Sequence, residues 1–458
     1  MKNRTLSRIL ALSLTLCLCT VAIIAGCIYA SAETRSSSSQ GAISSADSSE
    51  ANAVSLEMTG SSTASPVTVA NTTSGGAIDA SDLFSERDLA QTADLSEAVF
   101  YTVSDGQDIT ITEAGVCVLS GTASDVTVYV DADDEAKVQL VLDGVSITNA
   151  DFPCIYVRNA DKVFVTTSAD SALSVTGAFV SDGDTNTDGV IFSRDDLVLN
   201  GTATLTISSS DNAVVSKDDL KVTGGTYSIT ASSKALEAND SIRIADGTFY
   251  LTVGTDGLHA ENDEDDSLGY VYICGGSFTI DAGDDAIHGT TIVQIDGGTF
   301  AISAAEGIEG TYIQLNDGDI TISASDDGIN AGRKSTAVGT PTVEINGGTL
   351  TITMGAGDTD AIDANGNLII SGGTVTITAN SAFDYDGTAS LTGGTLIVNG
   401  QTVTSISNQM MGGRGGMMGG LGGSGGMEGS ESMGGFGGPG SDHGGMGGHG
   451  GMGGGWRG

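Results

Sequence analysis

The residues best placed to do chemistry are acidic side chains that recur in a four-residue pattern. The pattern is an acid, a small residue, Ile or Leu, and then a second polar residue. Its copies begin at Asp256, Asp285, Glu306, Asp327 and Asp360. If these copies stack as neighbouring strands about 4.8 Å apart, adjacent like charges repel by about 1–3 kcal/mol. A hard cation, raised pKa values or solvent must then offset that repulsion.

Calcium is the cofactor that this pattern predicts, because Ca²⁺ takes about six to eight oxygen ligands in flexible geometry. The predicted ligands are carboxylates of the pattern and carboxylate or amide oxygens of two nearby loops. They are Asp256, Asp263, Asp265, Asp284, Asp285, Glu306, Glu309, Asp326, Asp327, Asp360 and Asp363, together with Asp182, Asp184, Asn186 and Asp188. An acidic edge that is solvated and binds no ion remains the alternative.

The two loops have compositions typical of cation binding. Residues 182–189 read D-x-D-x-N-x-D-G, which resembles a calcium loop but lacks the glycine position and terminal Glu of an EF-hand. Residues 261–266 form an acidic run close to Asp256. At 234–237 the pattern begins with Lys234, so we expect no ion there unless Glu237 supplies a ligand.

The last position of the pattern holds His259, His288, Glu309 and Asn330 in successive copies. We predict that His259, His288 and Asn330 bind ligand, and a transition-metal pair or an acid/base couple of the two histidines stays open. No catalytic residue is predicted. Basic residues are scarce between 201 and 400, and we expect none of them inside an acidic position beside a second base.

The elements that would position these residues are short strands in a repeat. A glycine and a small polar residue precede an apolar-x-apolar strand in nine copies, which begin at Gly201, Gly225, Gly247, Gly276, Gly298, Gly318, Gly348, Gly373 and Gly394. A period of about 24 residues with strand alternation is typical of a parallel β-helix. In the copy at 348–353 we expect Leu350 and Ile352 to point inward and the threonines outward.

The chain ends differ from this repeat. A basic start and an apolar run from Ile9 to Ile24 predict a signal peptide over 1–32, with cleavage at a lipobox (24–27, lipidated on Cys27) or after the A-x-A site at 30–32. An uncleaved anchor helix remains open. We predict a Ser/Thr-rich linker over 33–96, the β-helix over 97–405 and a disordered Gly/Met-rich tail over 406–458. This order predicts an extracellular or cell-surface location.

Composition excludes some classes of function. The chain has 58 Asp and Glu against 17 Lys and Arg, and its net charge of −41 excludes nucleic acid as a partner. Beyond the export segment only Cys117, Cys154 and Cys274 remain. Their odd number and wide spacing predict buried small side chains, and neither a disulfide framework nor a zinc site.

Several stretches together resemble one bacterial family. They are residues 138–147, 193–201 and 216–222 and the D-G-I-x-A copies of the acidic pattern. These are similar to exported carbohydrate-binding β-helix proteins, which are related in fold to pectate lyases, and the similarity extends over about 99–399. It implies an all-β, right-handed, single-stranded parallel β-helix, bound calcium and binding of acidic sugars such as polygalacturonate, with cellulose as a further ligand. It makes the acids that begin the pattern candidate calcium or sugar ligands.

We therefore expect a surface-associated, calcium-dependent, monomeric protein that binds acidic polysaccharide and is not an enzyme. A chain of charge −41 should repel pectin, and a calcium ion shared between protein and sugar carboxylates removes that conflict. Two alternatives remain. One is a calcium-dependent lyase of the pectate-lyase type, and the other is a structural surface adhesin.

Overall fold

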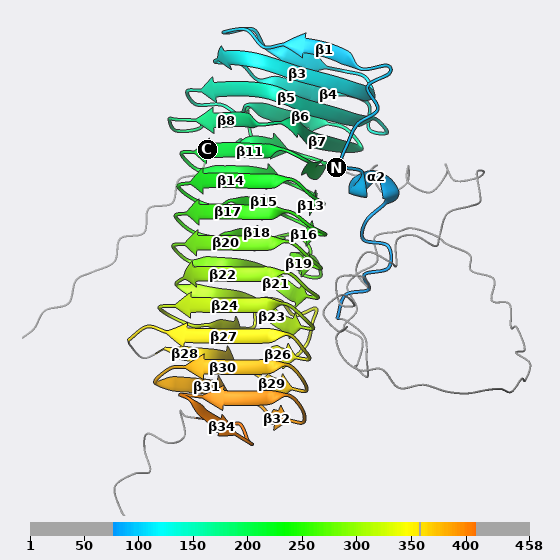
Figure 1. Ribbon diagram of the computed structural model, residues 1–458. Helices are drawn as coiled ribbons and strands as arrows, with labels where there is room; N and C mark the ends of the chain where they lie inside the picture. The colour runs from blue at the N-terminus through cyan, green and yellow to red at the C-terminus, as the bar shows by residue number, and fades with distance from the viewer. Residues whose placement is uncertain (1–76, 357–358, 409–458) are drawn as a thin grey trace, which may run out of the picture. The chain divides into compact units, whose positions relative to one another are not determined.

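The computed structural model describes residues 77–356 and 359–408. Within these ranges the chain forms short strands that wind into stacked coils, together with one four-residue helix, α2 (Glu86–Leu89) (Figure 1). The coils build three parallel ladders, because each strand pairs with the equivalent strand of the next coil. The prediction of an all-β coil is confirmed. No helix in the described ranges is long and apolar enough to cross a membrane. Cys27 and the predicted signal peptide lie outside the described residues.

The three ladders are called the first, second and third face here. The first face consists of β1 (Val99–Thr102), β3 (Gly115–Ser124), β5 (Lys137–Asn149), β7 (Lys162–Ala169), β10 (Asp196–Gly201), β13 (Asp219–Val222), β16 (Ser241–Ile244), β19 (Tyr270–Ile273), β21 (Asp285–Ile295), β23 (Glu306–Leu315), β26 (Thr342–Ile345), β29 (Asn367–Ile370) and β32 (Ala389–Leu391). The second face consists of β8 (Ser171–Val175), β11 (Thr204–Ser209), β14 (Thr226–Ala231), β17 (Thr248–Val253), β20 (Ser277–Ala282), β22 (Thr299–Ala304), β24 (Asp319–Ala324), β27 (Thr349–Met354), β30 (Thr374–Thr378) and β33 (Thr395–Val398), with the last halves of β3 and β5 at one end. At the other end β34 (Gln401–Val403) pairs antiparallel with β33.

The third face carries the acidic pattern. It consists of β2 (Ile109–Ile111), β4 (Val128–Asp131), β6 (Ile155–Asn159), β9 (Gly189–Ser193), β12 (Asn212–Ser216), β15 (Leu236–Ala238), β18 (Leu258–Ala260), the first halves of β21 and β23, β25 (Ile329–Ala331), β28 (Asp360–Ala364) and β31 (Ser381–Tyr385). Strands β21 and β23 turn a corner, so that their first halves belong to the third face and their last halves to the first face.

Alternation along each strand separates the core from the surface. In β27, Leu350 and Ile352 are buried while Thr349 and Thr353 are exposed, as predicted. Stacking joins the inward residues into one hydrophobic cluster that extends from Val103 to Leu396. A single coil cannot bury its own apolar side, so the stack gains its stability from contacts between neighbouring coils.

Four aromatic rings stack inside the coils. The ring centroids are 5.3 Å apart for Tyr227 and Phe249, 4.6 Å for Phe249 and Phe278, and 4.5 Å for Phe278 and Phe300. A buried ring in register with its neighbours lets a chain with few aromatics fill this part of the core. At the corner before β27, Gly348 has a φ of +72°, and a Cβ there would lie 2.5 Å from the Gly318 carbonyl oxygen. A side chain at this corner is therefore excluded.

The last part of the predicted linker is packed on the first face, which differs from the prediction. The amides of Ala77 and Ile78 donate to the side-chain oxygens of Gln314 and Gln294, both at 2.7 Å. Asp88 of α2 is only 1% exposed and pairs with Lys221 at 3.2 Å and Lys162 at 3.6 Å. The sequence did not predict this contact, because only a few residues of the segment make it and its overall Ser/Thr-rich composition is typical of a linker.

The first residues of the predicted tail also differ from the prediction. Ile406 packs against the core, and the side-chain amide of Asn408 donates to the Tyr385 carbonyl oxygen at 2.7 Å. Of the cysteines, Cys117 and Cys154 are buried and Cys274 is half-buried. Burial raises the pKa of Cys154 to about 12, which keeps this thiol protonated and inert.

Candidate functional site

One outward-facing residue from each coil forms a continuous column along the third face. We call it the outer column. In chain order its members are Tyr129, Tyr156, Phe192, Val215, Glu237, His259, His288, Glu309, Asn330, Asp363 and Asp384. The column is aromatic in the first coils and charged in the later coils. The last positions of the acidic pattern therefore stack in register, as predicted.

The acids that begin the pattern form a second row beside the outer column. Asp285 and Glu306 are paired across the ladder. Asp256 accepts a hydrogen bond from the Asp285 amide at 3.2 Å, and Asp327 accepts one from the Asp360 amide at 3.0 Å. These carboxylates therefore hold the backbone of the next coil in addition to carrying charge.

Three side chains gather in a buried cluster in the middle of the column. Nδ1 of His288 lies 2.9 Å from Asp285 and 2.8 Å from Glu309. The ring of His259 stacks on that of His288 with centroids 4.6 Å apart, and its own Nδ1 lies 2.8 Å from Asp256. Asp285, His288 and Glu309 each offer one ligand atom within 4.8 Å of the others, so the cluster could hold a metal ion.

Cations of the chain already balance this cluster. Burial disfavours a charged imidazole, but the hydrogen bonds to Asp285 and Glu309 outweigh it and raise the pKa of His288 to about 9. Burial likewise opposes ionisation of Glu309, yet His288 and Lys334 lower its pKa to about 2. At neutral pH the site therefore holds an imidazolium between carboxylates. A divalent ion bound by His288 would have to displace that proton.

Lys334 lies beside the outer column, a contact that the sequence repeat did not predict. Its Nζ is 2.6 Å from Glu309. The loop after β25 brings it there, because the amides of Lys334 and Ser335 both donate to the Thr311 hydroxyl, at 3.0 and 2.9 Å. Strand periodicity does not apply to this loop, so the sequence repeat could not place the lysine.

The last coils gather several carboxylates close to Asp363. Burial raises the pKa of Asp363 to about 7, and repulsion from Asp327, Asp384, Asp360 and Asp386 adds to the effect. Burial is the largest cause that raises the pKa of Asp327. A hydrogen bond from the Asp360 amide opposes this rise, and the neighbouring acids add to it. All these donors are oxygens, which suit Ca²⁺ better than the donors of the histidine cluster do. Among the described residues, however, no three of them lie within 4.8 Å of one another, so their side chains would have to move to share an ion.

Glu306 and Glu237 are two half-buried acids of the pattern. The Asn330 side-chain amide donates to Glu306 at 3.0 Å, while burial raises the pKa of Glu306 to about 7. Glu237 pairs with Lys217 at 3.2 Å and with Lys234 at 3.5 Å. The copy that begins with a lysine is therefore charge-balanced without an ion.

The two loops predicted to bind calcium are open. In the 261–266 loop, Asp263 and Asp265 are exposed, and Asp265 accepts hydrogen bonds from Ser267. Asp284 and Asp326, which directly precede two copies of the acidic pattern, are exposed as well. In the 182–189 loop, Asp184 is exposed, Asp182 pairs with Arg158 at 3.3 Å, and the Asn186 amide donates to Asp188 at 2.7 Å. Within the described residues, no set of three carboxylate, histidine or cysteine ligands forms in either loop. Calcium there stays a prediction.

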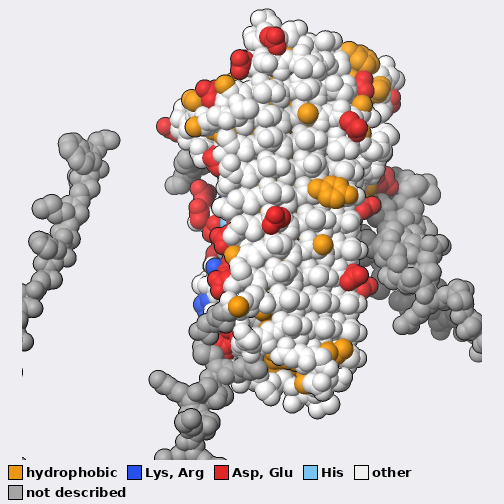
Figure 2. Space-filling model, turned by 60° about the vertical axis from the view of Figure 1, so that its left-hand side comes forward, with side chains coloured by type: hydrophobic (Ala, Val, Ile, Leu, Met, Phe, Trp, Pro, Cys, Tyr) orange, Lys and Arg blue, Asp and Glu red, His pale blue; other side chains and the backbone are white. Residues whose placement is uncertain are grey.

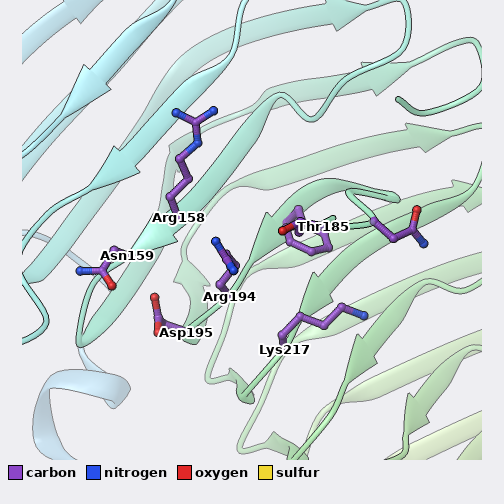
Figure 3. A pocket seen from close by; sticks show the side chains of 8 residues that line it. Arg158, Asn159, Thr185, Arg194, Asp195 and Lys217 are labelled. Carbon is purple, nitrogen blue, oxygen red and sulfur yellow. The ribbon is translucent and has the colours of Figure 1, made fainter. Parts of the chain in front are cut away.

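The sequence analysis missed a basic pocket at the aromatic end of the outer column. Its cavity of about 470 Å³ is lined by Arg158, Asn159, Thr185, Asn186, Phe192, Arg194, Asp195 and Lys217 (Figure 3). A sequence signal existed, since Ser193-Arg194-Asp195-Asp196 and Ser216-Lys217-Asp218-Asp219 repeat one motif with a cation in second place. In Figure 2, charged side chains gather along one edge of the stack, while the broad surface turned to the viewer carries few.

Comparison with known proteins identifies relatives. A family model described as "Carbohydrate-binding domain-containing protein" matches residues 105–355 and 303–410. A carbohydrate-binding domain-containing protein of Acetivibrio thermocellus is 35% identical over 124 residues, which are 26% of this chain and 43% of that protein. This chain thus spans less than half the length of that relative. A solved structure, titled as a polysaccharide lyase-like protein from C. thermocellum in a gadolinium derivative, is 31% identical with a TM-score of 0.44. It covers 49% of this chain and 96% of its own.

Proposed function

The chain belongs to the family of carbohydrate-binding domain-containing proteins, and from this we propose that it is a surface-associated protein that binds acidic polysaccharide through calcium. The proposed ligand is a chain of the polygalacturonate or pectin type, and cellulose is a second one. A right-handed coil, export of the protein and a lipid anchor at Cys27 are parts of the same proposal.

The observation that supports calcium is the crowding of carboxylates around Asp363. The carboxylates of Asp327, Asp384, Asp360 and Asp386 all act to raise the pKa of Asp363. A divalent cation bound among these oxygens relieves their repulsion and leaves coordination positions for a carboxylate of the sugar. In this way an acidic protein can bind an acidic polymer.

The histidine cluster contributes less to calcium binding. His288 and Lys334 already neutralise Glu309, and an imidazole nitrogen is a poor ligand for a hard cation. We therefore assign the bridging ion to the last coils, at the oxygen donors of Asp327, Asp360, Asp363 and Asp384. The acids of the earlier coils then act mainly in holding neighbouring coils together.

Binding of the protein to immobilised polygalacturonate, with Ca²⁺ or with EGTA, tests the proposal. We expect the affinity to fall by at least about 100-fold in EGTA. This loss corresponds to a coupling free energy of about 3 kcal/mol between the binding of calcium and the binding of polysaccharide. The double variant Asp363→Asn and Asp384→Asn should bind weakly even with Ca²⁺. The control Asp281→Asn removes an exposed charge on the second face and should bind as wild type. An affinity that EGTA leaves unchanged would refute the calcium bridge.

The alternative of a lyase has one observation in its favour, the lysine beside the acidic column. β-Elimination needs a base to remove the proton next to the sugar carboxylate. Burial opposes the charge on Lys334, but contact with Glu309 outweighs it and raises the pKa of Lys334. A lysine held protonated is a poor base, which supports a non-catalytic role. Appearance of unsaturated sugar, read as ultraviolet absorbance, would reverse this assignment.

A further inference from the structure

Three basic residues occupy equivalent positions in three successive coils. Arg158 follows Val157, Arg194 follows Ser193 and Lys217 follows Ser216, and those three preceding residues are paired in register. The amide of Arg194 donates to Val157 at 3.1 Å and that of Lys217 to Ser193 at 2.8 Å. Figure 3 shows the three side chains one after another along the pocket. They form a basic row whose rungs are about 4.8 Å apart at the backbone.

The middle cation of the basic row has no carboxylate partner. Arg158 pairs with Asp182 and Lys217 pairs with Glu237. Arg194 is exposed, and among the described residues its guanidinium has no ion pair. Because Arg158 and Lys217 are paired, the net positive charge of the row resides on Arg194. In a chain with 17 basic residues and 58 acidic ones such a row is exceptional. An anion beside Arg194 would neutralise the row.

Aromatic rings hold the outer cations in place. The guanidinium carbon of Arg158 lies 4.2 Å from the ring centroid of Tyr129 and 5.1 Å from that of Tyr156. The ammonium of Lys217 lies 5.8 Å from the ring centroid of Phe192. Nε of Arg158 is buried and has no hydrogen-bond partner among the described residues. Cations fixed in this way lose little conformational freedom when they bind a ligand.

The cavity beside the basic row has the size and the donors for a sugar. Its volume of about 470 Å³ lies in the range of small-molecule sites. Asn159, Thr185 and Asn186 line it with amide and hydroxyl groups, which suit the hydroxyls of a sugar. Arginine presents paired donors that match a carboxylate.

We propose that Arg158, Arg194 and Lys217 form a subsite that binds the carboxylates of an acidic sugar chain directly, without calcium. This inference rests on the proposed function for its choice of a carboxylated sugar. The subsite lies at the aromatic end of the outer column, and the carboxylates assigned to calcium lie in its last coils. One polysaccharide molecule could therefore be held by cations of the chain at one place and by calcium at another, which strengthens binding through multivalency.

Saturation-transfer NMR and calorimetry with trigalacturonate in EGTA test the subsite apart from calcium. Wild type should bind trigalacturonate, and Arg194→Gln should bind about tenfold more weakly because one charged contact is lost. Arg333→Gln removes an exposed arginine outside the pocket, whose guanidinium donates to Gly339, and should bind within about twofold of wild type. Circular dichroism checks that each variant is folded. Cellotriose, a sulfated oligosaccharide and inorganic phosphate serve as competitors.

Each outcome decides a separate point. Failure of trigalacturonate to bind in EGTA, or equal binding by Arg194→Gln and wild type, overturns the subsite even if the polymer binds with Ca²⁺. Equal competition by phosphate or the sulfated sugar shows a general anion site and overturns the assignment to carboxylates. If trigalacturonate binds and depends on Arg194, but the polymer gains nothing from Ca²⁺, the subsite stands and the calcium bridge fails.

Discussion

Replacing His288 with Asn tests the idea that the buried cluster is held together by a proton. In the native chain His288 lies between Asp285 and Glu309, 2.9 and 2.8 Å from their oxygens, and is 8% exposed. Asn keeps a hydrogen-bonding group at this position but carries no charge. The variant should lose the part of the stability that depends on protonation of the imidazole.

The size of that part follows from the pKa of His288. The pKa is raised from 6.5 to about 9 in the folded protein, and each unit corresponds to about 1.4 kcal/mol. The imidazolium thus contributes about 3 kcal/mol. Because the folded pKa is the higher one, this contribution is complete below pH 6.5 and is lost as pH rises through 9.

Urea unfolding of wild type and His288→Asn between pH 6 and pH 9.5, always in EGTA, measures the effect. The difference in unfolding free energy should shrink by about 3 kcal/mol across this range. The variant His259→Asn leaves the bonds from His288 to Asp285 and Glu309 and should keep the slope of wild type. A difference that does not change with pH, or an imidazole NMR signal of His288 that titrates below pH 7, would refute the reasoning.

Three further predictions concern other parts of the coil. Phe278→Ala removes a ring from the core stack and should lower the unfolding free energy by about 3–5 kcal/mol in urea titrations, whereas Tyr250→Ala, at a 53% exposed residue, should cost less than about 1 kcal/mol. Asp88→Ala leaves buried Lys221 without its carboxylate partner, while Lys162 keeps Asp196 at 3.5 Å, and should weaken docking of residues 77–98 by about 3 kcal/mol, seen as faster amide exchange there; unchanged exchange would contradict the packing described. Asp363→Asn should raise the unfolding free energy by about 1 kcal/mol in EGTA, because one crowded charge is gone, and should abolish the rise in melting temperature on adding Ca²⁺; Asp281→Asn should do neither.

Much of the fold could be predicted because a parallel coil converts sequence period into spatial register. Tyr227 and Phe249 occupy the same place in successive copies of the repeat, and their rings stack inside the core. The same reasoning placed His259 above His288 on the third face. The repeat period did not predict which of these charges are neutralised. The same spacing fits a column of unpaired acids and a column in which an imidazolium lies between two carboxylates.

Contacts made outside the repeat could not be predicted. Lys334 reaches Glu309 from a loop, and Asp88 reaches Lys221 from a segment whose composition indicates a linker. Neither segment has strand alternation, so its sequence pattern does not predict which coil it packs against. The basic row was partly visible in a repeated motif, but Arg158 lacks that motif and joins the row only through its ladder pairing.

The order of amino acids was enough to predict the strand repeat, the inward aliphatic and aromatic residues, and the alignment of one acidic pattern. These depend on hydrophobic burial and on the fixed spacing of paired strands, which act between consecutive copies. The folded chain was needed to see which charges are neutralised, where carboxylates crowd around Asp363, and how Arg158, Arg194 and Lys217 meet at one cavity. The physical reason is that electrostatic balance depends on distances in space, and loops of unequal length between the coils set those distances independently of the repeat.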